Sequence, residues 1–75
     1  MAIKEIYKEN DITATAWYLP DTAQWKPLVI IIEVKTGNVS TPRINRSFPT
    51  EYHAEREALF FAKKWIDDGK PPLQE

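Results

Sequence analysis

The fold of this chain is limited above all by an uninterrupted apolar run, Leu-Val-Ile-Ile-Ile, at residues 28–32. The run is rich in β-branched side chains and too short for a helix of its own, so it predicts a central β-strand over residues 28–35. Pro27 comes directly before the run and lacks the N–H that a strand ladder needs. Regular strand pairing is therefore expected to begin after Pro27.

Two segments that precede this run predict further strands of the same sheet. Residues 3–7 form a short stretch of alternating character, and the turn-forming residues 8–11 follow them. Residues 12–19 are rich in Thr, Trp and Tyr, which fit a pleated, half-buried surface. Pro and Asp within residues 20–24 then indicate a turn. The sequence thus predicts a small opening hairpin and a long strand before the central one.

A last strand is predicted after the central one. Thr36, Gly37 and Asn38 indicate a tight connection, because Gly and Asn tolerate a positive φ. The connection leads into residues 39–48, which we expect to pair as a hairpin. Pro42 lies inside this strand, and a proline there favours a sheet edge or a bulge.

A change of period from residue 50 onward predicts a helix near residues 51–68. Thr50 is suited to cap the first free N–H groups, and Gly69 followed by Pro71 is a stop signal. Apolar side chains recur at three- and four-residue spacing and so share one face of this helix. They are Ala54, Ala58, Phe61, Ala62 and Trp65.

The fold class that follows is α+β, with a three- to four-stranded antiparallel meander and one C-terminal helix packed on one face. Small alanines let a helix lie close to a sheet, and Phe61 and Trp65 would fill the space between them. We expect these two to cover the even-numbered face of the central strand. That face comprises Leu28, Ile30, Ile32 and Val34.

Length and composition exclude several classes of protein. The chain has 75 residues, no cysteine, one histidine and a net charge of −1. This length leaves room for one core, so a single domain over residues 1–75 is predicted, with residues 70–75 fraying at its end. A net charge near zero provides no general attraction to nucleic acid or to an anionic membrane.

The expected location is the cytoplasm. Residues 1–8 interleave charged and apolar side chains and lack the apolar core of a signal peptide. The longest apolar run, residues 28–32, is far shorter than the about 20 residues that span a bilayer.

Candidate chemistry in the sequence is sparse. His53 and Glu57 are spaced to share one helix face, but a structural metal site needs about four protein ligands. Ser40 or Ser47 with His53 would need an oxyanion loop, and neither serine lies in a small-residue elbow. We therefore predict no catalytic residue, no metal site, no cofactor and no enzymatic activity.

A pair of carboxylates, Asp67 and Asp68, lies at the helix C-terminus, where the helix dipole disfavours negative charge. Pairing with Lys63 and Lys64 one turn earlier is the expected compensation, at about 0.2 to 0.5 kcal/mol per pair.

The sequence resembles small uncharacterised bacterial proteins with a three-stranded meander and a C-terminal helix ending in Trp-Ile-Asp. The resemblance spans roughly residues 12–71. It is carried by Trp25, by Phe48-Pro49-Thr50, by Ala54, Ala58 and Ala62, and by Trp65-Ile66-Asp67-Asp68-Gly69-Lys70-Pro71. It implies the fold and no activity. The layout is also similar to part of a double-stranded RNA-binding domain, although the helix here begins with acidic residues in place of that family's lysines.

One surface of the predicted sheet stands out as a candidate interaction site. A single helix covers one side of a sheet, so Val29 and Ile31 are expected to point away from it and to form an exposed apolar patch with Trp17. The alternative is that these are scattered surface apolar residues and that Trp17 folds inward.

Two functional hypotheses follow from this patch. The first is a non-enzymatic interaction module that docks against a second copy or another protein. The second is nucleic-acid binding by the same face, with Trp17 for stacking and Lys35 and Arg43 for phosphates. Lys26 and Arg46 lie nearby in this second hypothesis. No membrane partner and no small-molecule substrate are expected, and an enzyme or metal protein is the third and least supported hypothesis.

Overall fold

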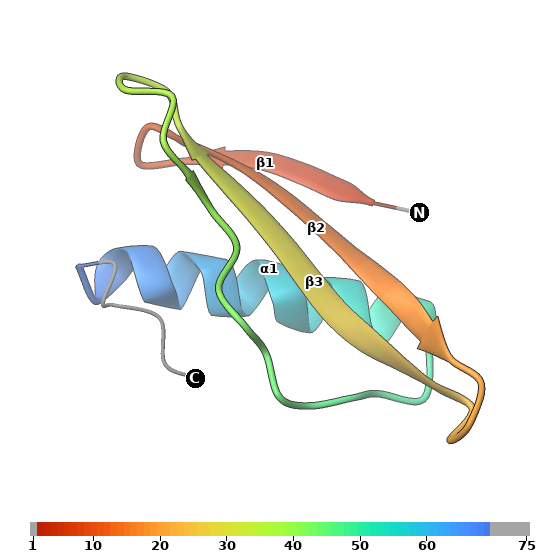
Figure 1. Ribbon diagram of the computed structural model, residues 1–75. Coiled ribbons are helices and arrows are strands. Elements are labelled where there is room, and N and C mark those ends of the chain that lie inside the picture. Colours follow the sequence, from red (N-terminus) through yellow and green to blue (C-terminus); the bar gives the residue numbers. More distant parts are fainter. Residues whose placement is uncertain (1, 70–75) are drawn as a thin grey trace.

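An antiparallel sheet with strand order β1-β2-β3-β4 is covered on one side by a single helix. The computed structural model describes residues 2–69, so the predicted fraying of residues 70–75 lies outside the described residues. The elements are β1 (Ile3–Tyr7), β2 (Asn10–Leu19), β3 (Gln24–Glu33), β4 (Val39–Ser40) and α1 (Glu51–Asp67). Figure 1 shows β2 and β3 passing over the helix. The predicted α+β meander with a C-terminal helix is confirmed.

The opening hairpin joins β1 and β2 through Lys8 and Glu9. Both residues have a positive φ, of 48° and 65°, which is the geometry that a two-residue hairpin turn with the correct twist requires. Asn10 is buried, and its side-chain amide donates hydrogen bonds to the carbonyls of Tyr7, at 3.3 Å, and Lys8, at 2.9 Å. These bonds hold the turn in a conformation that its side chains alone would disfavour.

Strand β3 begins earlier than the sequence predicted. Pairing with β2 runs through Pro27, which lies opposite Ala16, so the expectation that pairing starts after Pro27 is wrong. Trp25 N–H donates to the carbonyl of Phe48, away from β2, at 2.7 Å. Because N–H groups alternate in direction along a strand, the nitrogen of Pro27 also faces away from β2. The N–H that Pro27 lacks would point to the side where β3 has no paired strand at this position, since β4 pairs only with Ile31 and Ile32. The proline therefore costs the sheet no hydrogen bond.

Strand β4 is much shorter than the predicted strand over residues 39–48. Only Val39–Ser40 form a ladder with β3, and an isolated bridge between Trp25 and Phe48 marks the far end of the segment. Between these points the chain buries Pro42 and Ile44 without strand pairing. A proline cannot donate to the ladder, and the segment instead packs its alternate side chains into the core.

Helix α1 has the ends that the sequence predicted. The hydroxyl of Thr50 accepts a hydrogen bond from the backbone N–H of His53 at 3.1 Å, and Gly69 follows the helix with a φ of 85°. Ala54, Ala58 and Ala62 are all fully buried. The helix therefore lies close to the sheet along its alanine face.

The predicted core face of β3 is wrong. Val29 and Ile31, which are 3% and 1% exposed, lie under the helix with Ile12 and Ala14 of β2. The even-numbered side chains of β3 face away from it, and Val34 lies beyond the strand end and is exposed. Phe61 and Trp65 do pack against the core as expected, but against the odd-numbered face.

A polar clamp joins the opening hairpin to the end of α1. The Asp67 carboxylate accepts hydrogen bonds from Tyr7 Oη, at 2.9 and 3.0 Å, and pairs with Lys8 Nζ at 2.6 Å. Lys63 pairs with Glu5 of β1. Partners from the hairpin thus take the place of the expected pairing of Asp67 with Lys63. The contact with Asp67 also raises the pKa of Lys8 above 10.5.

Acid is expected to weaken this clamp. Hydrogen bonds from Lys8 and Tyr7 hold the pKa of the Asp67 carboxyl below its usual value of 3.8. A lowered folded-state pKa means that the stabilisation is complete above the unfolded-state pKa and is lost as the pH falls through the folded value. We expect the melting temperature of the wild type to fall more between pH 7 and about pH 2 than that of Asp67→Asn.

The matched control for this prediction is Asp68→Asn. It removes the same charge one residue later, at a side chain that is not bonded to Tyr7 or Lys8. Its acid dependence should therefore equal that of the wild type. An Asp67→Asn variant with unchanged acid dependence would contradict the assignment of Asp67 as the titrating member of the clamp.

Candidate interaction surface

The face of the sheet turned away from α1 carries exposed apolar side chains from all four strands. We call this surface the open face. Its apolar members are Ile6, Trp17, Leu19, Leu28, Ile30, Ile32 and Val39. Ile6 is 72% exposed and Trp17 63%, while Ile30 and Ile32 keep 39% and 38% of their surface in contact with solvent. A sheet that faces water alternates polar residues outward, so this composition is typical of a surface that contacts protein.

The register of β2 and β3 determines how polar and apolar groups are distributed across the open face. Thr13 lies opposite Ile30, and Thr15 lies opposite Leu28. The β3 side is therefore an aliphatic stripe, and the β2 side a row of threonines. Such a stripe with a polar border matches the apolar centre and polar rim of protein–protein interfaces.

Trp17 lies near one end of the open face, opposite Lys26 in the register. The two side chains line a shallow hollow together with Leu19 and Leu28, with a volume of about 290 Å³. Exposed tryptophans beside a hollow are common anchors of protein interfaces, because the large ring buries much area at a small entropy cost.

The structure separates the residues that the sequence brought together as an interaction site. Trp17 is exposed on the open face. Val29 and Ile31 are buried beneath α1, so the expectation that they form the exposed patch is wrong. The prediction assigned the wrong side of β3 to the helix. The run at residues 28–32 is apolar on both sides, so the sequence of this strand does not indicate which side the helix covers.

Of the two cations assigned to the nucleic-acid hypothesis, Lys35 lies apart from Trp17. Lys35 follows the far end of β3 and pairs with Glu9 at 3.2 Å, whereas Trp17 lies opposite the start of β3. At about 3.3 Å per residue, the seven positions of β3 from Lys26 to its end at Glu33 correspond to about 23 Å, and Lys35 lies beyond that end. Arg43 is exposed on the segment that follows β4.

The open-face apolar residues that the sequence analysis missed are Ile6, Leu19, Leu28, Ile30, Ile32 and Val39. The signal that identifies them lies in β2, where Ile12 and Ala14 alternate with Thr13 and Thr15. The apolar set of β2 belongs under the helix, and the register then assigns the odd-numbered side chains of β3 to the same side.

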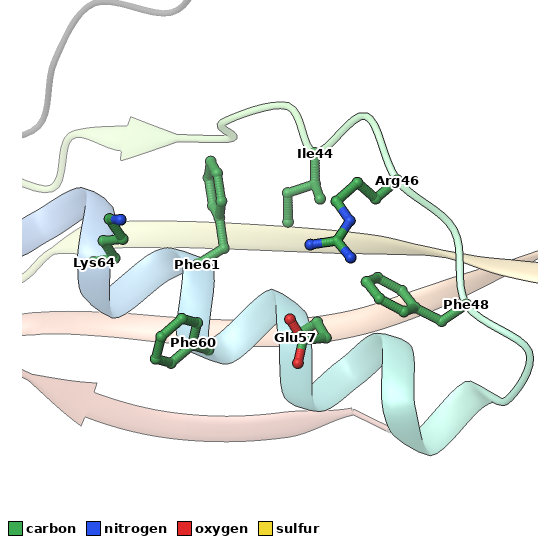
Figure 2. Close-up of a pocket in the computed structure, with 7 residues that line it drawn as sticks. All are labelled: Ile44, Arg46, Phe48, Glu57, Phe60, Phe61 and Lys64. Carbon is green, nitrogen blue, oxygen red and sulfur yellow. The ribbon is translucent and has the colours of Figure 1, made fainter.

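A second hollow lies on the opposite side of the molecule, between α1 and the segment after β4. Figure 2 shows Ile44, Arg46 and Phe48 on one wall and the helix residues Glu57, Phe60, Phe61 and Lys64 on the other. Its volume is about 150 Å³. Pockets for small molecules and cofactors usually measure about 300 to 1,000 Å³, so this one accommodates a single side chain at most.

The described residues offer little for metal or nucleophilic chemistry. No group of three or more His, Cys, Asp or Glu that could hold a metal ion occurs among residues 2–69. His53 Nε2 lies 3.9 Å from a carboxylate oxygen of Glu57, and its ring packs on Phe48 with centroids 4.6 Å apart. Ser47 donates its hydroxyl hydrogen bond to Gln24 at 2.6 Å, not to a base.

The fold and the surface together define a small α+β domain with an open apolar sheet face. No protein-family model, curated protein or solved structure significantly matches the chain. The resemblance to small bacterial meander proteins therefore stays a prediction. Within residues 2–69 no helix is long and apolar enough to cross a membrane.

Proposed function

We propose that this chain is a small non-enzymatic interaction module that binds protein through its open face. The observation that supports this proposal is the aliphatic stripe of Leu28, Ile30 and Ile32, which lies opposite the helix with Trp17 at one end. Water contact with such a stripe costs about 25 cal/mol for each Å² of apolar surface. A partner that covers the stripe recovers this free energy.

The same stripe bears on the stability of the domain. A chain of 75 residues buries a smaller fraction of its surface than a larger domain does. A partner that binds only the folded state adds to its stability by mass action. Binding through the open face thus supplements a core that one helix and one sheet make small.

Nucleic-acid binding is the weaker candidate for the same face. Lys35, one of the cations assigned to it, lies at the other end of β3 from Trp17 and already pairs with Glu9. Affinity for nucleic acid comes largely from cations placed along the phosphate backbone. Among residues 2–69, the strand positions of the open face hold Lys4 and Lys26 as cations and Asp11 among the apolar members. Arg46 lines a hollow together with Lys26 and Leu19.

Site-specific photo-cross-linking in cells tests the proposal. The photoreactive residue p-benzoylphenylalanine replaces Trp17 in one variant and Tyr52 of α1 in another. The two aromatic rings are equally accessible, at 63% and 65% exposure, but lie on different surfaces. We expect protein adducts from position 17 and few or none from position 52.

Two outcomes of this experiment would contradict the proposal. Equal adduct yields from the two positions would show that exposure alone determines cross-linking. An adduct from position 17 that contains nucleic acid instead of protein would favour the second candidate.

A further inference from the structure

Charged side chains of opposite sign mark the two ends of the open face. Asp11 lies on β2 at one end, opposite Ile32, and Lys26 lies on β3 at the other end, opposite Trp17. We call two residues that face each other in the register of β2 and β3 a rung. The rungs of Asp11 and Lys26 are six positions apart on β2, which corresponds to about 20 Å at about 3.3 Å per residue. Both side chains point away from the helix, because their neighbours Ile12 and Pro27 are buried beneath it.

The centre of the open face between these ends is apolar on β3. Leu28 and Ile30 lie there, opposite Thr15 and Thr13. Consider a twofold axis that lies parallel to the sheet, perpendicular to its strands, and midway between Leu28 and Ile30. This axis stacks a second copy on the open face with its strands turned end for end. It places Ile30 of each copy over Leu28 of the other. Such an isologous contact requires a surface that is complementary to itself.

The positions of the charges distinguish between two ways of stacking identical sheets. In the end-for-end arrangement, Asp11 of each copy comes to the rung that holds Lys26 of the other, so two opposite-charge pairs form. If the axis instead runs along the strands, every rung meets its own equivalent. Asp11 then lies beside Asp11 and Lys26 beside Lys26, and like charges at an interface are unfavourable.

The area of the open face suits a weak dimer. Ten residues of β3 extend about 33 Å, and strands lie about 4.8 Å apart. All four strands together thus present about 430 Å², roughly half of the about 800 Å² per partner of a standard interface. Stacked sheets of this kind cross at about 30° because each sheet is twisted.

We propose that the partner of the open face is a second copy of this chain, stacked end for end so that Asp11 of each copy pairs with Lys26 of the other. This inference rests on the proposed function, since it names the occupant of the same surface. The remaining cation of the open face, Lys4, lies on the edge strand β1 and outside the central contact.

Sedimentation equilibrium of the purified full chain with charge-reversal variants tests the arrangement. We expect the wild type to dimerise at micromolar concentrations. Asp11→Lys alone and Lys26→Asp alone each convert two attractive pairs into repulsive ones, so each should weaken dimerisation about tenfold or more. An equimolar mixture of the two variants should associate as strongly as the wild type, because only mixed dimers restore both pairs.

The double variant Asp11→Lys plus Lys26→Asp provides an independent check, because it restores both pairs within a single species. Circular dichroism of each single variant verifies the fold, which these solvent-facing positions should leave intact. A mixture no more dimeric than its components would overturn the end-for-end arrangement. A wild type that stays monomeric up to about 1 mM would overturn self-association, since weaker contacts are not specific dimers.

The cross-linking at position 17 separates failure of this inference from failure of the proposed function. Adducts of twice the chain mass support self-docking, and they should map near Asp11 of the other copy. Adducts only to a different protein would leave the proposed function standing and would remove the second copy as the partner. Absence of adducts together with a monomeric chain would remove both.

Discussion

Replacing Ile31 by alanine is expected to lower the free energy of unfolding by about 2 to 5 kcal/mol. Ile31 is 1% exposed and lies in the core between Ile12 of β2 and the alanine face of α1. Truncation leaves a cavity that the surrounding sheet cannot close, because its backbone is held by strand pairing on both sides of this position. Urea denaturation followed by tryptophan fluorescence measures the change.

The matched control for Ile31→Ala is Ile30→Ala, the same substitution one residue earlier on the same strand. Ile30 faces solvent on the open face, so we expect its truncation to cost less than about 1 kcal/mol. Both variants should be measured at a protein concentration low enough to keep the chain monomeric, because dimerisation adds to apparent stability. The reverse order of the two losses would show that the helix covers the even-numbered face.

This pair of residues also shows where prediction from the sequence ends. A five-residue apolar run specifies a buried strand, but a period of two cannot choose a face when both faces are apolar. Glu33 and Lys35 are the polar odd-numbered residues that follow the apolar run. In the structure Glu33 accepts a hydrogen bond from Thr36 in the turn, and Lys35 lies beyond the strand. Their polarity reports the end of the strand and not its exposed side.

The segment over residues 39–48 was predicted as a strand because residues 36–38 indicate a hairpin connection. Pro42, Ile44 and Phe48 of this segment are buried, whereas Arg46 is exposed. An extended chain alternates its side chains whether or not it has a ladder partner. A ladder with β3 forms only at Val39 and Ser40, so the predicted strand over residues 39–48 is correct for its first two residues alone.

Sequence signals that act over a few neighbouring residues were more reliable than the prediction of the buried face of β3. The cap at Thr50 and the left-handed residue at Gly69 depend only on neighbours within one helical turn, and the structure confirms both. The partners of Asp67 lie on a hairpin some 60 positions away in the sequence, and no local rule selects them. The open face also depends on contacts between distant parts of the sequence, because the side of the sheet that α1 covers determines which side stays open.

Replacing Ala58 by leucine is expected to destabilise the fold by about 1 to 3 kcal/mol, even though leucine is larger and more apolar. Ala58 has no exposed surface, and the helix approaches β2 and β3 along its line of alanines. Three additional carbon atoms have no free volume there, so α1 must move away from Ile12 and Ile31 and lose its contacts with them. Thermal and urea denaturation both report this loss.

Lys64→Leu is the control that separates overpacking from helix propensity. Lys64 lies on the exposed side of α1, and lysine and leucine have similar helix propensities, so its replacement should change the free energy of unfolding by less than about 0.5 kcal/mol. If Ala58→Leu were as stable as the wild type, the helix would have room to spare above the sheet. The burial of Ala54, Ala58 and Ala62 against β2 and β3 would then need an explanation other than close packing.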